Sequence, residues 1–424
     1  MKIVIVGGGF AGINLAKELT NVPEIEVILV DKNNYNFFPP LIYQVATAFL
    51  EPSSISYPFR KFFAGKKNLR FRLAEVLRVH PAENTVILDD GELTYDHLVF
   101  ASGAETSFFG MENVQKNAIP MKTLNDSIEM RNKLLQNMEH AVITKNIRER
   151  RKYLTIVVAG GGPTGVEVSG MLSEMRNGVL RKEYPELSTS ASKIYLVDGG
   201  NALLSPMSTE SQKDTYDALS KMGVTIKLNT RVTDYKDDLV YFANGETIAT
   251  KNLIWAAGIT AKKFEGLPDE SYGRGQRMLT DAYSKVNFTT NIYAIGDTSI
   301  MFNDARFPNG HPQVAQVAIQ QGKNLAKNFI NMLNNKPLKS FEYKDKGSMA
   351  IIGKNKAVVD LPKPKMHFNG FFAWMVWLFI HLISLITYRN RINTFYNWMV
   401  AYFAKDQSYR MIIRPEKTNS TNKV

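Results

Sequence analysis

One glycine pattern occurs twice in the chain, each time directly after a short apolar run. KIVIVGGGFAG at residues 2–12 and YLTIVVAGGGPTG at residues 153–165 both contain Gly-x-Gly-x-x-Gly and lead into a helical stretch. In such a unit the first glycine makes a tight turn, the second admits a pyrophosphate, and the third lets helix and strand pack closely. Two such units in tandem predict an α/β fold that binds two dinucleotides.

An acidic residue ends the next strand of each unit, where it can accept a hydrogen bond from a ribose hydroxyl. Asp31 follows Gly7 by 24 residues, and Asp198 follows Gly160 by 38 because residues 183–192 lengthen the crossover. The spacing therefore supports Asp198 less directly than Asp31. A carboxylate at this place repels a 2′-phosphate, so we expect NADH rather than NADPH.

Further strands repeat the same design. Residues 90–103 and 244–258 each contain a turn, an apolar strand and a small-residue end that closes in glycine. A third strand at 289–299, TTNIYAIGDTS, is interpreted as the return of the chain to the first unit, with the second unit inserted. Asp297 would then reach a ribityl or pyrophosphate group, and a simple turn is the alternative. A protein with two dinucleotides typically passes hydride between a flavin and a nicotinamide.

Composition excludes several kinds of chemistry. The 424 residues predict two or three domains. The absence of cysteine excludes disulfides, thiolate metal sites and redox cysteine pairs, and six scattered histidines leave little for a metal site, so we expect no metal. The net charge of +12 calls for an anionic partner. Because the chain opens directly into the first strand, we expect no cleavable leader.

The C-terminal region differs in character from the rest. Residues 366–388 carry no fixed charge, and Trp374, Trp377 and Trp398 lie in this region. Eight Lys or Arg and two acidic residues between positions 363 and 417 add basic charge. This mixture predicts an interfacial membrane anchor rather than a nucleic-acid site. The alternatives are a buried helix, a dimer contact, or a transmembrane helix, which the polar residues Asn369, His381 and Ser384 disfavour.

Residues 310–329, GHPQVAQVAIQQGKNLAKNF, predict a helix with two unusual neighbouring stripes. Glutamines at 313, 316 and 320 share one face, and mostly small residues at 315, 319, 322 and 326 form the next stripe. Close packing on a neighbouring helix is one interpretation. The other is a ligand site, because amides can donate hydrogen bonds without titrating.

Together these features resemble the two-dinucleotide flavoprotein reductases, and within them the type II NADH dehydrogenases, the single-subunit NADH:quinone oxidoreductases of respiratory membranes. The matching segments are NNYNFFPPLIYQVAT, GGGPTGVEVSG, IWAAG, AIGD and AQVAIQQG. The last matches the family's Ala-Gln-x-Ala-x-Gln quinone pattern and is the most discriminating. The resemblance implies bound FAD, NADH and quinone as substrates, and a monotopic tail on the cytoplasmic face of a bacterial inner membrane. It leaves a homodimer, and the choice between menaquinone and ubiquinone, open.

The resemblance and the fingerprints together give a set of expected site residues. The cofactor-binding residues of the first unit would be Gly7, Gly8, Gly9, Phe10, Ala11, Gly12, Asp31, Lys32, Gly103, Gly296, Asp297, Ala315 and Gln316. Those for NADH would be Gly160, Gly162, Gly165, Asp198, Ala257 and Gly258. Quinone would contact Tyr43, Gln44, Gln316 and Gln320, and the catalytic residues would be Glu167, Gln316 and Gln320. The thin edge of the glutamine helix would lie near the flat flavin. For Glu167, a carboxylate that only stabilises the first turn of its helix is the alternative.

Rival functions fit parts of the sequence. A sulfide:quinone reductase or disulfide reductase needs cysteines that the chain lacks. A ferredoxin- or rubredoxin-type reductase with a protein acceptor fits the nucleotide units but not the tail. A redox sensor or scaffold is disfavoured by complete fingerprints and by the glutamines. Because no intramembrane relay of ionisable residues is present, we expect no proton pumping. The expected domains are 1–120 with 275–345 for FAD, 121–274 for NADH, and 346–424 for membrane anchoring.

Overall fold

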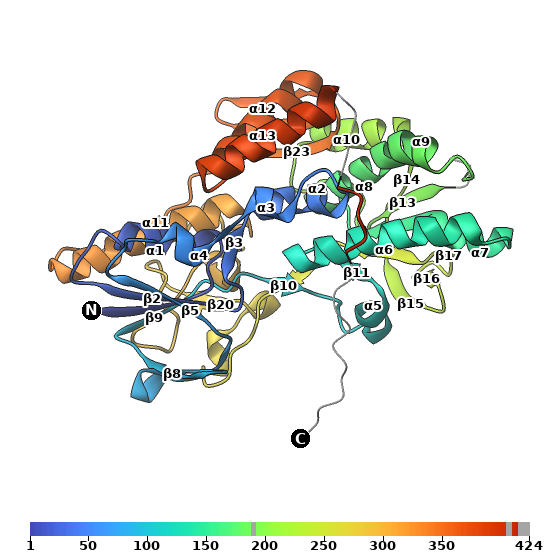
Figure 1. Ribbon diagram of the computed structural model, residues 1–424. Coiled ribbons are helices and arrows are strands. Elements are labelled where there is room, and N and C mark those ends of the chain that lie inside the picture. Colours follow the sequence, from blue (N-terminus) through green and yellow to red (C-terminus); the bar gives the residue numbers. More distant parts are fainter. Residues whose placement is uncertain (188–191, 404–408, 414–424) are drawn as a thin grey trace. The chain divides into compact units, whose positions relative to one another are not determined.

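The computed structural model describes residues 1–187, 192–403 and 409–413 (Figure 1). Its internal contacts define two compact units. Unit 1 comprises Met1–Phe37, Ser56–Ser107 and Ile259–Lys346, and unit 2 comprises Phe38–Ile55, Phe108–Gly258 and Gly347–Val424. Residues 188–191 of the predicted crossover insertion, and residues 404–408 and 414–424 of the predicted anchor, lie outside the described residues. The domain bounds expected from the sequence stay a prediction.

Unit 1 is built on a five-stranded parallel sheet with the strand order β21-β9-β1-β2-β5. These strands are β1 (Lys2–Val6), β2 (Glu26–Asp31), β5 (Leu69–Leu73), β9 (His97–Phe100) and β21 (Ile292–Ala294). The apolar runs noted in the sequence are buried in it, as expected for parallel strands covered on both faces. Because β21 pairs with β9, the chain returns to this sheet after unit 2, as the sequence predicted.

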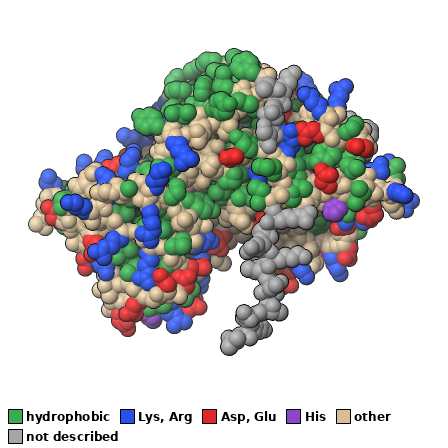
Figure 2. Space-filling model, in the orientation of Figure 1, with side chains coloured by type: hydrophobic (Ala, Val, Ile, Leu, Met, Phe, Trp, Pro, Cys, Tyr) green, Lys and Arg blue, Asp and Glu red, His purple; other side chains and the backbone are tan. Residues whose placement is uncertain are grey.

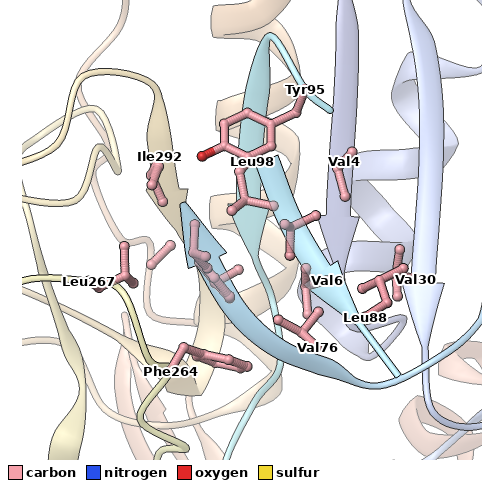
Figure 3. Close-up of a cluster of buried hydrophobic side chains, with 14 of the residues drawn as sticks. Val4, Val6, Val30, Val76, Leu88, Tyr95, Leu98, Phe264, Leu267 and Ile292 are labelled. Carbon is pink, nitrogen blue, oxygen red and sulfur yellow. The ribbon is translucent and has the colours of Figure 1, made fainter. Parts of the chain in front are cut away.

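A second layer packs against this sheet. It is the antiparallel sheet of β6 (Val76–His80), β7 (Thr85–Leu88) and β8 (Gly91–Thr94). Figure 3 shows Val4, Val6 and Val30 of the parallel strands in one apolar cluster with Val76 and Leu88. The packed layers hold the carboxyl ends of the strands, and therefore the glycine turn, in a fixed place. Shorter strands of unit 1 are β3 (Tyr35–Phe37), β4 (Ser56–Pro58), β10 (Glu105–Thr106), β19 (Ile259–Thr260), β20 (Met278–Thr280) and β22 (Ser299–Met301).

Two helices of unit 1, α1 (Phe10–Leu19) and α11 (Ala315–Leu333), pack closely on each other. A Cβ atom at Gly322 would lie 2.5 Å from the carbonyl oxygen of Ala11. In the middle of the small-residue edge of α11, Gly322 therefore packs against α1. The expectation that this edge faces the flavin is wrong at Gly322, because α1 already occupies that side.

Unit 2 repeats the design of unit 1, as the tandem fingerprints predicted. Its parallel sheet has the order β11-β18-β12-β13-β14, with the fingerprint strand again in the middle. The strands are β11 (Ile119–Pro120), β12 (Thr155–Ala159), β13 (Lys193–Val197), β14 (Val224–Lys227) and β18 (Asn252–Trp255), and the antiparallel layer is β15 (Val232–Lys236), β16 (Leu239–Phe242) and β17 (Thr247–Ala249). The main helices are α6 (Leu124–Ile143), α7 (Ile147–Leu154), α8 (Pro163–Met175) and α10 (Thr209–Lys221).

The C-terminal part of unit 2 is an antiparallel sheet followed by two helices. The sheet comprises β23 (Ser348–Gly353), β24 (Lys356–Pro362) and β25 (Lys365–Asn369), and the helices are α12 (Gly370–Ser384) and α13 (Tyr388–Phe403). β23 lies directly on α8, since a Cβ at Gly170 would meet the carbonyl oxygen of Ile352 at 1.7 Å. None of the helices in the described part of the chain has the length and apolar character that a bilayer crossing requires.

A polar cluster joins β25 to α10, immediately before α12. The His367 Nε2 atom lies 2.9 Å from Asp214 Oδ2, and Nδ1 lies 3.0 Å from Asp360 Oδ1. Asp360 also accepts hydrogen bonds from the backbone and hydroxyl of Ser208. Burial lowers the pKa of His367, but the hydrogen bonds and charges of the two carboxylates outweigh it and raise the pKa above its usual value. Protonated His367 on β25, the strand that leads into α12, therefore binds Asp214 on α10.

We predict that His367→Ala lowers the free energy of unfolding in a pH-dependent way. A raised folded-state pKa gives stability that is complete below the unfolded pKa and disappears as pH rises through the folded value. Near pH 5.5 we expect a loss of about 1–2 kcal/mol, the order of a charge-assisted hydrogen bond, and a smaller loss near pH 9. Urea unfolding at the two pH values measures it, and equal losses at both would contradict the assignment.

Candidate active site

The turn between β1 and α1 forms a backbone cradle in unit 1. Gly7 has φ +101°, and a Cβ there would lie 2.5 Å from the carbonyl oxygen of Ala101. At Gly12 a Cβ would lie 1.9 Å from the carbonyl oxygen of Gly7, whereas Gly9 faces open space. Asp31 Oδ2 accepts a hydrogen bond of 2.7 Å from the Gly8 amide. The cradle therefore fits the pyrophosphate of FAD, with room at Gly9 and a carboxylate beside the turn.

Unit 2 contains a second cradle with nearly the same geometry. A Cβ at Gly160 would lie 2.4 Å from the carbonyl oxygen of Ala256, and one at Gly165 would lie 1.8 Å from that of Gly160. Asp198 accepts hydrogen bonds from the Gly161 amide at 2.5 Å and from the Gly200 amide at 2.6 Å. Gly162, like Gly9 in unit 1, faces open space. The residues present fit a second dinucleotide, and the longer crossover has not displaced the acid.

Two glutamines, Gln321 on α11 and Gln313 just before that helix, bind the Gly296–Asp297 turn. Gln321 is 2 % exposed, and its Oε1 atom accepts a hydrogen bond of 2.7 Å from the Gly296 amide. Gln313 Nε2 donates to the carbonyl oxygen of Asp297 at 3.0 Å. Gln313 belongs to the glutamine stripe expected from the sequence, whereas no role was predicted for Gln321, and neither was expected in the site. Because Gln321 lies off the 313–316–320 stripe, the helical pattern gave no signal for its role.

Gln316 and Gln320 contact the segment that follows α11 within unit 1. Gln320 pairs with the backbone of Lys344 in both directions, at 3.0 Å and 2.9 Å. Gln316 Oε1 accepts from the Lys346 amide at 3.1 Å. These amides therefore fix the chain beside α11, and their contact with quinone stays a prediction. The remaining predicted quinone residues, Tyr43 and Gln44, belong to unit 2.

Within unit 2, Glu167 and Tyr43 form a buried pair. Glu167 on α8 is 8 % exposed, and Tyr43 on α2 (Ile42–Ala46) is 1 % exposed. Burial raises the pKa of Glu167 well above its usual range, although the Ile351 amide donates a hydrogen bond to it. Burial and the nearby Glu167 carboxylate raise the pKa of Tyr43 as well. A carboxylate that serves only the helix dipole has no need of burial, which is costly, so the geometry favours a functional role.

A hydrogen-bond chain continues from Tyr43 into the C-terminal helices. Gln44 Nε2 donates to Tyr43 Oη at 3.0 Å, and Trp398 Nε1 of α13 donates to Gln44 Oε1 at 2.7 Å. Trp377 is fully buried, stacks on His381 with ring centroids 3.7 Å apart, and lies 6.1 Å from the Trp398 ring. Burial lowers the pKa of His381 to about 4, so that this ring is neutral at physiological pH. From the sequence, Trp377 and Trp398 were expected in the anchor, and the hydrogen bond from Trp398 to Gln44 was not predicted.

The outer faces of α12 and α13 expose large apolar side chains. Figure 2 shows hydrophobic side chains gathered over these two helices, at the top of the view. Their exposed fractions range from 38 to 79 %. On α12 they are Phe371, Phe372, Met375, Phe379, Ile380 and Ile383, and on α13 they are Tyr388, Ile392, Phe395, Tyr396, Met399 and Phe403. A continuous apolar face of this kind marks a contact surface for lipid or protein.

Comparison with known proteins gives first a class and then a family. The family model of the pyridine nucleotide-disulphide oxidoreductases matches residues 1–322, which is the class that the two cradles define. The model of the NDH2 C-terminal domain matches residues 346–407. The type II NADH:quinone oxidoreductase NdhA of Mycobacterium tuberculosis is 34 % identical over 95 % of this chain and 87 % of its own, and Ndh of the same organism is 30 % identical over 95 % and 88 %. The chain therefore belongs to the type II NADH:quinone oxidoreductase family.

Solved structures share the fold. NDH2 from Plasmodium falciparum in complex with NADH has a TM-score of 0.87 and 22 % identity over 97 % of this chain and 99 % of its own. The sulfide:quinone oxidoreductase of Aquifex aeolicus has a TM-score of 0.74 and 19 % identity over 96 % of each chain. Since the present chain has no cysteine, it shares the architecture of its class without a cysteine-based redox centre.

We predict that the two cradles fail separately when their third glycine is substituted. Gly12→Ala should reduce bound FAD, whereas Gly165→Ala should retain FAD and raise the KM for NADH about ten- to a hundredfold, since a forced methyl group costs roughly 1–3 kcal/mol. Flavin absorbance and steady-state kinetics measure the two effects. Gly178→Ala is the matched control, because a Cβ there meets nothing within 4 Å. Equal loss of FAD in both variants would contradict separate cradles.

Proposed function

We propose that this enzyme oxidises NADH and reduces a membrane quinone through bound FAD, without pumping protons. The observation that carries the proposal lies on α13. This helix exposes an apolar face, and its Trp398 also hydrogen-bonds Gln44 beside the buried Tyr43–Glu167 pair. Tyr43 and Gln44, which suit a quinone head group, are therefore connected by hydrogen bonds to the helix whose exposed apolar face suits lipid. The relatives named above as NADH:quinone oxidoreductases support the same activity.

The two cradles would hold the two dinucleotides. FAD, when bound, accepts a hydride from NADH and returns two electrons to the acceptor. Gly7, Gly9 and Gly12 would hold its pyrophosphate, with Asp31 beside the ribose. α11 begins at Ala315, and its N-terminal end would face the flavin, where the helix dipole favours negative charge. NADH would enter the unit 2 cradle, and Asp198 would favour it over NADPH.

Reduction of a quinone to a quinol needs two electrons and two protons. The hydride of NADH brings both electrons and one proton, so one further proton is needed, and the buried Glu167 can supply it. Burial raises the pKa of Glu167, which favours its protonated form and suits it to donate a proton. Tyr43 also remains protonated and can donate a hydrogen bond to a quinone carbonyl. Gln316 and Gln320 would border the head group with uncharged amides. Nothing in this scheme moves protons across a membrane.

The apolar faces of α12 and α13 would lie in the membrane interface, with the enzyme monotopic on the cytoplasmic face. Arg389 lies in the first turn of α13, next to the exposed Tyr388, and is itself exposed, so it can meet anionic headgroups. Aromatic rings and cations on one helix surface are typical of interfacial anchors. This arrangement assigns residues 1–120 with 275–345 to FAD binding, 121–274 to NADH binding and 346–424 to membrane attachment. A homodimer remains compatible with it.

We predict that Glu167→Gln slows only the quinone half-reaction. The amide keeps the volume of the side chain but cannot deliver a proton, so we expect reoxidation of the reduced enzyme to fall about a hundredfold. Reduction by NADH should change little. Anaerobic stopped-flow absorbance follows the two half-reactions separately. If both rates match those of the wild type, Glu167 is not a catalytic residue. If the wild type is not reoxidised by a short-chain quinone, the proposed function is wrong.

We predict that the double variant Phe379→Glu and Phe395→Glu detaches the enzyme from membranes. Each charge replaces an exposed apolar ring that would lie among lipids, at a cost of a few kcal/mol. Flotation with anionic phospholipid vesicles measures binding, and activity with a short-chain quinone should be kept. Ile143→Glu with Ile147→Glu is the matched control, since these side chains are 75 % and 62 % exposed elsewhere on unit 2. Unchanged flotation of the first variant would overturn the anchor.

A further inference from the structure

The inner face of α13 carries a row of hydrogen-bonding side chains. Asn390 Nδ2 donates to the Ser54 carbonyl oxygen at 2.9 Å, and Thr394 Oγ1 donates to the same oxygen at 3.2 Å. Asn397 Nδ2 donates to Ser54 Oγ at 3.3 Å. Asn390 and Thr394 are 1 % and 0 % exposed. Spacings of three and four place the row on one side of the helix, and this side is held to Ser54 of α3 (Pro52–Ile55).

Trp398 ends this row and differs from its other members. Its Nε1 atom donates to Gln44 Oε1 at 2.7 Å, so its partner lies on α2, whereas the bonds of Asn390, Thr394 and Asn397 above go to Ser54 on α3. Because Gln44 is 4 % exposed, no bulk water can replace the indole as its donor. The contact is therefore specific to the side chain of Trp398, whereas Asn390, Thr394 and Asn397 attach the helix.

The chemistry of the indole fixes the orientation of the Gln44 amide. An indole N–H only donates, so the amide oxygen must face Trp398 and the amide nitrogen must face Tyr43. Gln44 Nε2 then donates to Tyr43 Oη at 3.0 Å, and Tyr43 Oη accepts. The hydroxyl hydrogen of Tyr43 is thereby directed away from Gln44 and is available to another acceptor. With the opposite orientation of the amide, its oxygen would instead accept that hydrogen.

We propose that Trp398 is a positioning residue for quinone reduction, which acts through the Gln44 amide to present the Tyr43 hydroxyl hydrogen to the quinone carbonyl. This inference rests on the proposed function, since it assigns the acceptor of that hydrogen. In this role the hydrogen-bond chain begins at Trp398 on α13, the helix that also carries part of the exposed apolar face. Trp398 itself touches neither substrate nor cofactor in this role.

The test uses Trp398→Phe, which keeps an aromatic ring but loses the N–H donor. In anaerobic stopped-flow experiments with full-length enzyme and a short-chain quinone, we expect the maximal rate of reoxidation to fall about tenfold, the effect of one lost hydrogen bond. The apparent Kd for quinone, the FAD content and the rate of reduction by NADH should change little. Trp374→Phe is the control, because Trp374 packs on Tyr402 and does not contact Gln44 through any hydrogen bond that the structure describes.

A double-mutant cycle separates positioning from general packing. Gln44→Met removes the amide at similar volume and breaks the same hydrogen-bond chain at its middle residue, so it should produce a similar loss. In the Gln44→Met background, Trp398→Phe should have no further effect, because its route to Tyr43 is already broken. The proposal would be overturned if the losses of the two single variants multiplied in the double variant. It would also be overturned if Trp398→Phe were reoxidised at the wild-type rate. Failure of the wild-type enzyme to react with quinone would instead sink the proposed function itself.

Discussion

The structure depends on one backbone contact made twice, in which a helix starts so close to a strand that only glycine fits. A side chain at Gly12 or Gly165 would overlap the carbonyl oxygen at the start of its own turn. The contact brings the N-terminus of a helix to the carboxyl end of the sheet, where backbone amides and the helix dipole attract a pyrophosphate. Each unit therefore obtains its binding site from the same feature that lets its layers pack.

Burial is the feature on which the proposed reduction of quinone depends. Glu167 and Tyr43 would both prefer water, and the fold places them where their uncharged forms are favoured. Hydrogen bonds reach both groups, from Ile351 to Glu167 and from Trp398 through Gln44 to Tyr43. Under the proposed function, two groups that favour their protonated forms near an apolar surface would suit an acceptor that arrives from lipid. The same helix, α13, contributes to both.

Local patterns predicted the fold well, and long-range contacts limited what could be predicted of the site. The fingerprints, the repeated strands and the return of the chain at β21 follow from residues adjacent in sequence, so they were visible there. The hydrogen bond between Gln44 and Trp398 joins positions 354 residues apart, and no spacing rule indicates it. The small stripe of α11 was misassigned at Gly322 because flavin contact and helix packing both favour small residues. The role of Gln321 was not predicted, because a single buried glutamine that hydrogen-bonds a loop leaves no periodic signal in the sequence.

The central claim is that one chain holds a flavin and a nicotinamide so that electrons pass from one to the other and on to quinone. Its most direct test is an anaerobic titration of the purified protein, followed by absorbance. The account predicts a yellow protein whose flavin bands bleach on addition of NADH and return on addition of a short-chain quinone. A colourless protein that cannot be reconstituted with FAD, or a flavin that NADH leaves oxidised, would contradict it.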